Sequence, residues 1–310
     1  MKFSLILTFA LLVFLALTAG GQTTRPAPRP TPRPAAKAKF ERIVDARLKN
    51  AGHRDGLAEI CQVGTDPTAR RIFAEYGAVF VSEDVMLPAL CIYDSERDVQ
   101  DFQSQPDKQT ATIGGVPVVL QAAAMEALLA ARTEALKAGL NITPRGGSTA
   151  ATRSFGDTVT FWNSRLLPGL AYWVRQKRIA AAEAEAVKRF PVRAQVARVL
   201  EWEKDGIYFS KDLSKSILYS VAAPGASQHV FMLAFDVTQF ASPKVREILA
   251  RHGWFQTVAS DLPHFTYLGV MDDDPAKRES KLEALGLIKV KNSGQDFWVP
   301  DMALEEIHVK

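Results

Sequence analysis

The sequence predicts an α+β fold in which a small antiparallel sheet is flanked by helices. Its 310 residues are 47% hydrophobic and 23% charged, which is typical of a globular protein with a buried core. Several segments carry apolar residues at helical spacing, and shorter runs between them are rich in β-branched and aromatic residues. Two of these runs, 112–120 and 287–299, have the turn residues of hairpins, and hairpins pair antiparallel.

The N-terminus predicts an export signal over residues 1–21. Lys2 precedes an apolar stretch from Phe3 to Ala16, and small residues suitable for cleavage follow at positions 19–21. We therefore expect the chain to be exported to the periplasm or the extracellular space, with the signal cleaved. About seventeen apolar residues is the lower limit for spanning a bilayer, so an uncleaved anchor is the alternative. No cysteine follows the apolar stretch, which excludes a lipoprotein anchor.

Residues 22–39 form a proline-rich segment, expected to act as a semi-rigid linker before a single domain at 40–310. Residues 1–39 carry six Lys and Arg and no acid, which leaves 32 basic and 34 acidic residues for the remainder, a net charge of −2. The high pI therefore belongs to the N-terminal segment. This argues against a nucleic-acid-binding domain, and nothing predicts a stable protein partner.

Cys61 and Cys91 are the only cysteines. An even count in an exported chain predicts one disulfide, closing a loop of about thirty residues and contributing roughly 3–4 kcal/mol. Two buried free thiols are the alternative.

The first half of the chain predicts mostly helices. Asp66 and Pro67 form a typical helix start, and the segment at 121–136 is rich in alanine. We expect helices at 40–49, 57–61, 65–73, 98–102 and 121–136, a strand at 78–85, the hairpin at 112–120 and extended structure at 141–161.

Residues 165–204 predict one or two helices divided by Pro191. We interpret them as an insertion that forms a lid or a substrate-side wall, with a simple packing helix as the alternative. Downstream we expect strands at 217–221, 233–237, 253–258 and 265–269, helices at 243–251 and 275–285, and the hairpin at 287–299. Ser242 is the expected N-cap of the helix at 243–251.

The chemistry is concentrated in residues 227–236 and 261–264. These two segments contain two of the five histidines, His229 and His264, together with Asp236 and Asp261. Two histidines and one carboxylate around an open position are a common ligand set for a hydrolytic zinc, and a neighbouring acid is suited to be the general base. The remaining histidines have no such neighbours; His252, at a helix end, is expected to cap carbonyl groups.

Spacing constrains how His229 and Asp236 could share one ion. In a straight strand they would lie about 23 Å apart and on opposite faces. A helix would bring them to one face about 10.5 Å apart, but the intervening residues favour a strand. We therefore predict a turn just after His229, followed by a strand from about Leu233 to Val237.

These segments resemble a known family. The pattern Ser227-x-His229-x-x-Met232-x-Ala234-x-Asp236 is similar to the SxHxxGxAxD motif of zinc D-alanyl-D-alanine carboxypeptidases, the VanY-type enzymes of the lysostaphin, D-Ala-D-Ala peptidase and hedgehog group. Asp261-x-x-His264 resembles the family's ExxH motif, and Arg153-Ser154-Phe155 its arginine-serine-aromatic segment. The resemblance covers residues 140–270, about half the chain.

The resemblance implies a hedgehog-like peptidase fold and a zinc-dependent D,D-carboxypeptidase that acts on peptidoglycan stem peptides. It implies Zn²⁺ bound by His229, Asp236 and His264, with Asp261 as the general base. Arg153 and Ser227 would contact the substrate carboxylate or the oxyanion. An ion pair between Arg153 and Asp157 is the alternative for that arginine.

Three positions depart from the family. Met232 replaces a glycine, Asp261 replaces a glutamate one methylene longer, and Thr158 stands where a glutamine is usual. These departures favour one alternative, a non-catalytic cell-wall-binding protein that retains the fold and has lost catalysis. An exported domain without a metal is a third possibility. The scissile bond stays open, because D,D-carboxypeptidases, L,D-carboxypeptidases and endopeptidases share these ligands.

Overall fold

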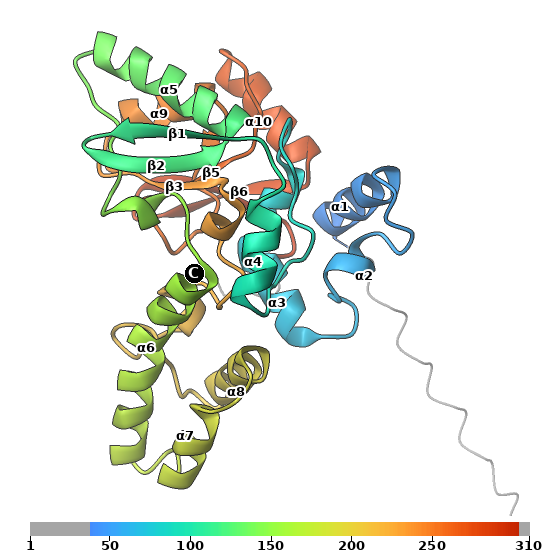
Figure 1. The fold of residues 1–310 in the computed structure, drawn as a ribbon, viewed down its shortest axis with the longest axis vertical. Helices are drawn as coiled ribbons and strands as arrows, with labels where there is room; N and C mark the ends of the chain where they lie inside the picture. The colour runs from blue at the N-terminus through green and yellow to red at the C-terminus, as the bar shows by residue number, and fades with distance from the viewer. Residues whose placement is uncertain (1–37, 304–310) are drawn as a thin grey trace, which may run out of the picture. The chain divides into compact units, whose positions relative to one another are not determined.

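The computed structural model describes residues 38–303, which contain helices and three small antiparallel sheets (Figure 1). This mixture of helices and small antiparallel sheets agrees with the predicted α+β class. The export signal at 1–21, nearly all of the linker at 22–39, and His308 lie outside the described residues. Among residues 38–303, no helix combines the length and the apolar character needed to cross a membrane.

The predicted N-terminal helices and the disulfide are confirmed. The helices are α1 (Lys39–Asn50), α2 (Leu57–Ile60) and α3 (Pro67–Tyr76), and the Asp66 side chain accepts a hydrogen bond from the backbone N–H of Thr68. A disulfide joins Cys61 to Cys91, with their Cα atoms 5.3 Å apart. It therefore ties the end of α2 to the loop before α4.

The predicted strand at 78–85 is wrong. The chain leaves α3 directly into a 3₁₀ helix, η1 (Gly77–Val81), whose five residues are all buried. A short buried apolar run has the same pattern in a strand and in a helix. The 3₁₀ helix packs against strands of the sheets, and directly after it Ser82 Oγ donates to the carbonyl of Tyr267 and the Glu83 N–H donates to that of Leu268.

The next elements follow the prediction. They are α4 (Glu96–Gln103), the hairpin of β1 (Lys108–Ile113) and β2 (Val116–Gln121), and α5 (Ala122–Lys137). Helix α5 packs against this hairpin and against α9 (Pro243–Arg251), which Ser242 caps as predicted. His252 is the C-cap of α9, and its backbone N–H donates to the carbonyls of Ile248 and Leu249. Its side chain takes no part in the cap, since its Nε2 lies 2.9 Å from Glu134 Oε2 on α5.

The extended structure predicted for 141–161 ends early. A 3₁₀ turn, η2 (Ser148–Ala150), precedes α6 (Phe155–Arg175). Ser154 and Asp157 form a reciprocal capping box, which fixes the start of α6 at Phe155. Ser154-x-x-Asp157 was the sequence signal for this boundary.

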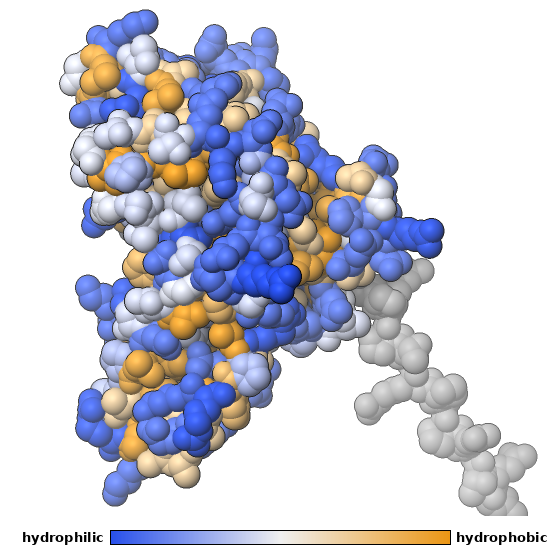
Figure 2. All heavy atoms as spheres, in the orientation of Figure 1, coloured by the Kyte–Doolittle hydropathy of each residue, from blue (hydrophilic) through white to orange (hydrophobic). Residues whose placement is uncertain are grey.

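Helices α6, α7 (Ala181–Val187) and α8 (Val192–Lys204) confirm the predicted helical segment, and Pro191 is the N-cap of α8. They lie together on the side of the sheets away from α5 (Figure 1). Figure 2 shows apolar side chains among polar ones over this segment. Three of the large exposed apolar residues belong to it: Phe161, Leu167 and Phe190.

The central sheet has the strand order β3-β5-β4, with β3 (Ala234–Asp236), β4 (Trp254–Phe255) and β5 (His264–Tyr267) all buried. The predicted strand at 217–221 is instead a 3₁₀ turn, η3 (Ile217–Tyr219), which begins where the Ser216 side chain accepts from the Leu218 N–H. Helix α10 (Pro275–Ala284) and the hairpin of β6 (Leu287–Asn292) and β7 (Gln295–Pro300) follow as predicted.

Candidate metal centre

A 3₁₀ turn, η4 (Gln228–Phe231), presents His229, and the chain then reverses through Met232 into β3. Met232 adopts the left-handed conformation, with φ 57°, at the position where the family motif has glycine. The backbone N–H of Met232 closes the turn on the carbonyl of His229 at 3.2 Å. The predicted turn after His229 and strand at 233–237 are therefore confirmed.

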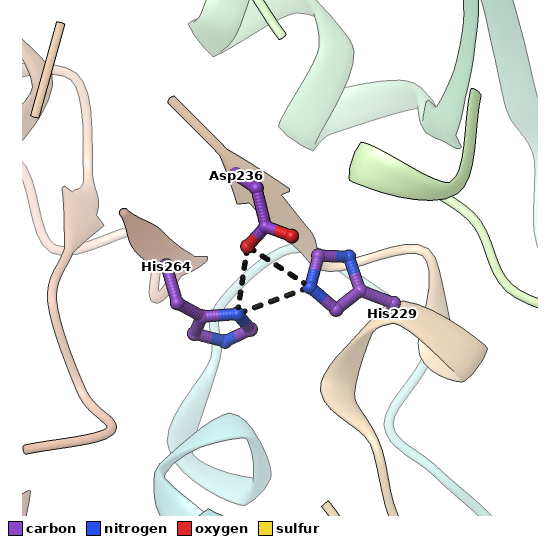
Figure 3. Close-up of side chains that lie close together, drawn as sticks. All are labelled: His229, Asp236 and His264. Atoms are coloured by element: carbon purple, nitrogen blue, oxygen red, sulfur yellow. Dashed lines mark hydrogen bonds and ion pairs between the residues drawn. The ribbon is translucent and has the colours of Figure 1, made fainter. Parts of the chain in front are cut away.

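The register of the central sheet brings Asp236 and His264 together. Strands β3 and β5 pair antiparallel so that Asp236 lies directly opposite His264, although 28 residues separate them. Side chains at directly opposite positions of an antiparallel pair have Cβ atoms about 4.5–5.5 Å apart. Figure 3 shows the three side chains converging from η4, β3 and the start of β5.

The three inward atoms are His229 Nε2, His264 Nδ1 and Asp236 Oδ1. The two nitrogens are 3.0 Å apart, and they lie 3.2 and 3.3 Å from the carboxylate oxygen. Zinc with ligands at about 2.0–2.1 Å in a tetrahedron has ligand atoms about 3.3 Å from one another. The spacing therefore fits a zinc ion held by three protein ligands.

Hydrogen bonds fix the tautomer of each imidazole. His229 Nδ1 lies 3.1 Å from the carbonyl oxygen of Ala151, which can only accept, so Nδ1 carries the proton. His264 Nε2 lies 2.7 Å from Gln228 Oε1. The Gln228 amide nitrogen donates to the carbonyl of Tyr76 at 2.8 Å, which turns its oxygen toward His264. When the rings are neutral, both inward nitrogens therefore carry no proton and present a lone pair to the centre.

His229 is held neutral by its surroundings. It is 1% exposed, and burial, assisted by the positive charge of Arg153, lowers its pKa to about 4. A neutral imidazole is the form that binds a metal ion. At neutral pH, His229 is therefore ready to act as a ligand.

Arg153 holds the third predicted ligand, Asp236, in place. Its Nη2 donates to Asp236 Oδ2 at 2.7 Å, and its Nε donates to the carbonyl of Thr149 at 2.9 Å. The guanidinium also lies over the ring of Phe161, 4.7 Å from its centroid. The alternative ion pair with Asp157 does not form, because Asp157 is engaged in the capping box. Arg153 therefore leaves Oδ1 of Asp236 free to face the two histidines.

The centre as a whole consists of three acceptors and no donor. Two lone pairs and one carboxylate oxygen within 3.3 Å repel one another unless a cation or a proton lies between them. Every outward heteroatom of the three side chains already has a partner. These residues thus fit a bound divalent metal, and nitrogen and carboxylate ligands in this number suit zinc.

A cavity of about 230 Å³ borders the centre. Its wall contains the two histidines and three further residues that the sequence predicted for the site: Arg153, Ser227 and Asp261. The third ligand, Asp236, lies behind the histidines and is not part of this wall. The His264 N–H donates to the Asp261 carbonyl at 3.2 Å, so one tight turn holds the predicted base beside a ligand. Burial raises the pKa of Asp261, and the negative charge of Asp236 raises it further.

Thr158, which departs from the family, has a structural role. Its hydroxyl accepts from the backbone N–H of Gly225 at 3.1 Å and donates to the carbonyl of Phe155 at 2.6 Å. Gly225 has φ 72°, and a Cβ there would lie 1.9 Å from the Tyr93 carbonyl oxygen. Thr158 thus anchors the tight turn that leads into Ser227 to the first turn of α6.

Sequence reasoning missed three polar residues of the site. Gln228, between Ser227 and His229 in the motif, is fully buried and orients His264. Arg165 on α6 and Ser260 before Asp261 line the cavity. The only sequence signal for Gln228 was its place inside the motif, and Arg165 and Ser260 had none.

No family model, curated protein or solved structure matches this chain. The fold and the site therefore define its class by themselves: an α+β protein with a buried site of two histidines and one carboxylate beside a small cavity.

Proposed function

We propose that the protein is an exported zinc-dependent hydrolase of the D,D-carboxypeptidase type that acts on peptidoglycan stem peptides. The observation that carries this proposal is the convergence of three proton-free acceptors, 3.0–3.3 Å apart, beside a cavity that is lined by the two histidines and by Asp261. A structural zinc site would be closed by a fourth protein ligand. Among the described residues, the only cluster of potential metal ligands is this trio, so the fourth position is left for solvent or substrate.

Zinc bound here would supply a Lewis acid and would lower the pKa of a coordinated water. Asp261 accepts a proton from the attacking water and delivers it to the departing amine as the amide C–N bond breaks. Burial raises the pKa of Asp261, which makes its carboxylate a stronger base than an exposed one. Arg153 and Ser227 face the same cavity, where they stabilise the oxyanion or hold the substrate.

The shorter side chain of Asp261 limits the expected rate. It is one methylene shorter than glutamate, and a misplacement of about 1 Å costs about a hundredfold. We therefore propose a slow enzyme.

The test measures zinc content and the release of D-alanine from a peptide that ends in D-Ala-D-Ala. Wild-type protein should hold one zinc and turn the peptide over. Asp261→Asn should abolish turnover with the zinc retained, because Asp261 is a base and not a ligand. Asp261→Glu should hold or raise the rate. Turnover by Asp261→Asn at the wild-type rate would refute the assignment of the base.

A non-catalytic cell-wall-binding protein is the second candidate, favoured by the shortened acid at Asp261. It predicts stoichiometric zinc and binding of the same peptide with no release of D-alanine. Turnover, rather than zinc content, separates the two candidates.

A further inference from the structure

We infer that Arg165 and Ser260 form the subsite that holds the free terminal carboxylate of the substrate. The inference rests on the proposed function and deepens it by naming the residues that would determine the preference for a chain end. It assigns a role to two residues that lie outside the motifs.

Arg165 is a cation without an anion. It lies on α6, one helical turn after Phe161, and lines the cavity that borders the metal centre. Its Nη1 donates to the Ser164 hydroxyl at 3.0 Å and to the Ser164 carbonyl at 3.5 Å. Within residues 38–303 no carboxylate forms an ion pair with it, and its Nε is buried without a partner. A guanidinium whose Nε–H is buried without an acceptor is stabilised by an incoming anion.

Ser260, which lines the same cavity, supplies a second polar group without a partner. Its Oγ is buried and has no hydrogen-bond partner among the described residues. Only four buried side-chain polar atoms of residues 38–303 lack a partner, and two of them, Arg165 Nε and Ser260 Oγ, belong to residues that line this one cavity. A guanidinium N–H and a hydroxyl are both donors, and a carboxylate accepts from both.

Arg153 is less suited than Arg165 to bind the substrate carboxylate. Its charge is balanced by Asp236 at 2.7 Å, and its Nε already donates to the carbonyl of Thr149.

The size of the cavity agrees with a chain end. At about 230 Å³ it is smaller than the roughly 300–1,000 Å³ of sites that enclose drug-sized ligands. Apolar side chains of Phe161, Leu218 and Val258 complete its wall. A peptide that ends one residue past the scissile bond places its carboxylate at Arg165. A peptide that continues brings a neutral amide there and leaves the cation unpaired.

The experiment compares two peptides that both end in D-Ala-D-Ala, one with a free carboxylate and the other with a carboxamide. Hydrolysis is measured with the zinc-loaded protein, and binding is measured by calorimetry with zinc-loaded Asp261→Asn. The variants are Arg165→Met, Arg165→Lys and Ser260→Ala. Arg175→Met removes the same charge from an exposed position of the same helix and is the matched control.

Wild-type protein should prefer the free acid about 10- to 100-fold in kcat/KM, as expected for hydrogen bonds to a charged group. Arg165→Met should lose this preference through a higher KM for the acid, with the amide unchanged and zinc retained. Arg165→Lys should restore part of the preference, Ser260→Ala should weaken it, and Arg175→Met should resemble wild type.

Equal use of both peptides by wild type, or a parallel loss of both in Arg165→Met, would overturn the subsite. The calorimetric measurement separates this failure from failure of the proposed function. If neither peptide is hydrolysed but the free acid binds in an Arg165-dependent way, the subsite stands and the catalytic proposal fails.

Discussion

Two groups of residues at the cavity differ in how far their polar atoms are satisfied: the metal centre, and the pair Arg165 and Ser260. In the metal centre, the outward atoms of His229, Asp236 and His264 each have a fixed partner: Ala151, Arg153 and Gln228. In the pair, Arg165 Nε and Ser260 Oγ are buried and have no partner among residues 38–303.

This difference distinguishes two kinds of binding site. A metal site must hold its ligands in one geometry and one protonation state before the ion arrives, and outward hydrogen bonds do this. A substrate site exchanges its contacts in every turnover, so its donors have no permanent partner in the protein. Substitutions in the metal centre should therefore change zinc content, and substitutions of Arg165 or Ser260 should change ligand preference.

The largest effect is expected from His229→Ala. Loss of one of three ligands should reduce bound zinc from one equivalent to a trace in the purified protein, as measured by elemental analysis. Arg165→Met is the matched control and should retain full zinc. Stoichiometric zinc in His229→Ala would break the comparison, because the metal would then lie elsewhere.

Removal of the disulfide should act on stability and spare the centre. The loop that begins at Cys91 reaches Tyr93, whose N–H donates to the carbonyl of Gly225 in the turn before Ser227. Replacing both cysteines by serine should lower the free energy of unfolding by about 3–4 kcal/mol, measured by denaturant titration of protein purified under oxidising conditions. Two free thiols in exported wild-type protein would contradict the disulfide.

Glu75 is a buried acid outside the lining of the cavity, and it should make the free energy of unfolding depend on pH. It is 2% exposed, and burial raises its pKa from 4.5 to about 7, opposed by Arg71 and assisted by Glu203. The folded protein therefore holds a proton that the unfolded chain releases near pH 4.5. The resulting stability is complete below pH 4.5 and is lost as the pH rises to about 7.

Glu75→Gln should remove this pH dependence. Between pH 4.5 and 8, wild type should lose up to about 3 kcal/mol more stability than the variant, measured by denaturant unfolding at each pH. Glu59→Gln, at an exposed acid, is the control. Parallel pH profiles of wild type and Glu75→Gln would show that Glu75 is ionised in the folded protein.

The smallest effect is expected from Gln228→Leu, which removes the partner of His264 Nε2 but no ligand. Loss of such a partner typically reduces metal affinity about 10- to 100-fold. Competition with a chelator measures this change. Ser260→Ala should leave the affinity for zinc unaltered. An equal loss of zinc affinity in both variants would remove the distinction between the metal centre and the pair Arg165 and Ser260.

Local signals in the sequence predicted much of the fold. The Asp66-Pro67 start of α3, the Ser242 cap of α9 and the turn of the β6–β7 hairpin each depend on residues next to one another in the chain. The turn after His229 followed from the impossibility of a straight strand. The errors at 78–85 and 217–221 concern short apolar runs, for which helix and strand give the same pattern.

The sequence by itself determined the ligand types, the turn that separates His229 from Asp236, and the pair of cysteines. Only the tertiary structure decided that Asp236 lies opposite His264, that Arg153 pairs with Asp236 rather than Asp157, and that Arg165 shares their cavity. Local conformation depends on neighbouring residues and leaves a signature in the order of amino acids. Contacts between distant segments depend on sheet register and on which charges are desolvated together, and these arise only when the whole domain has packed.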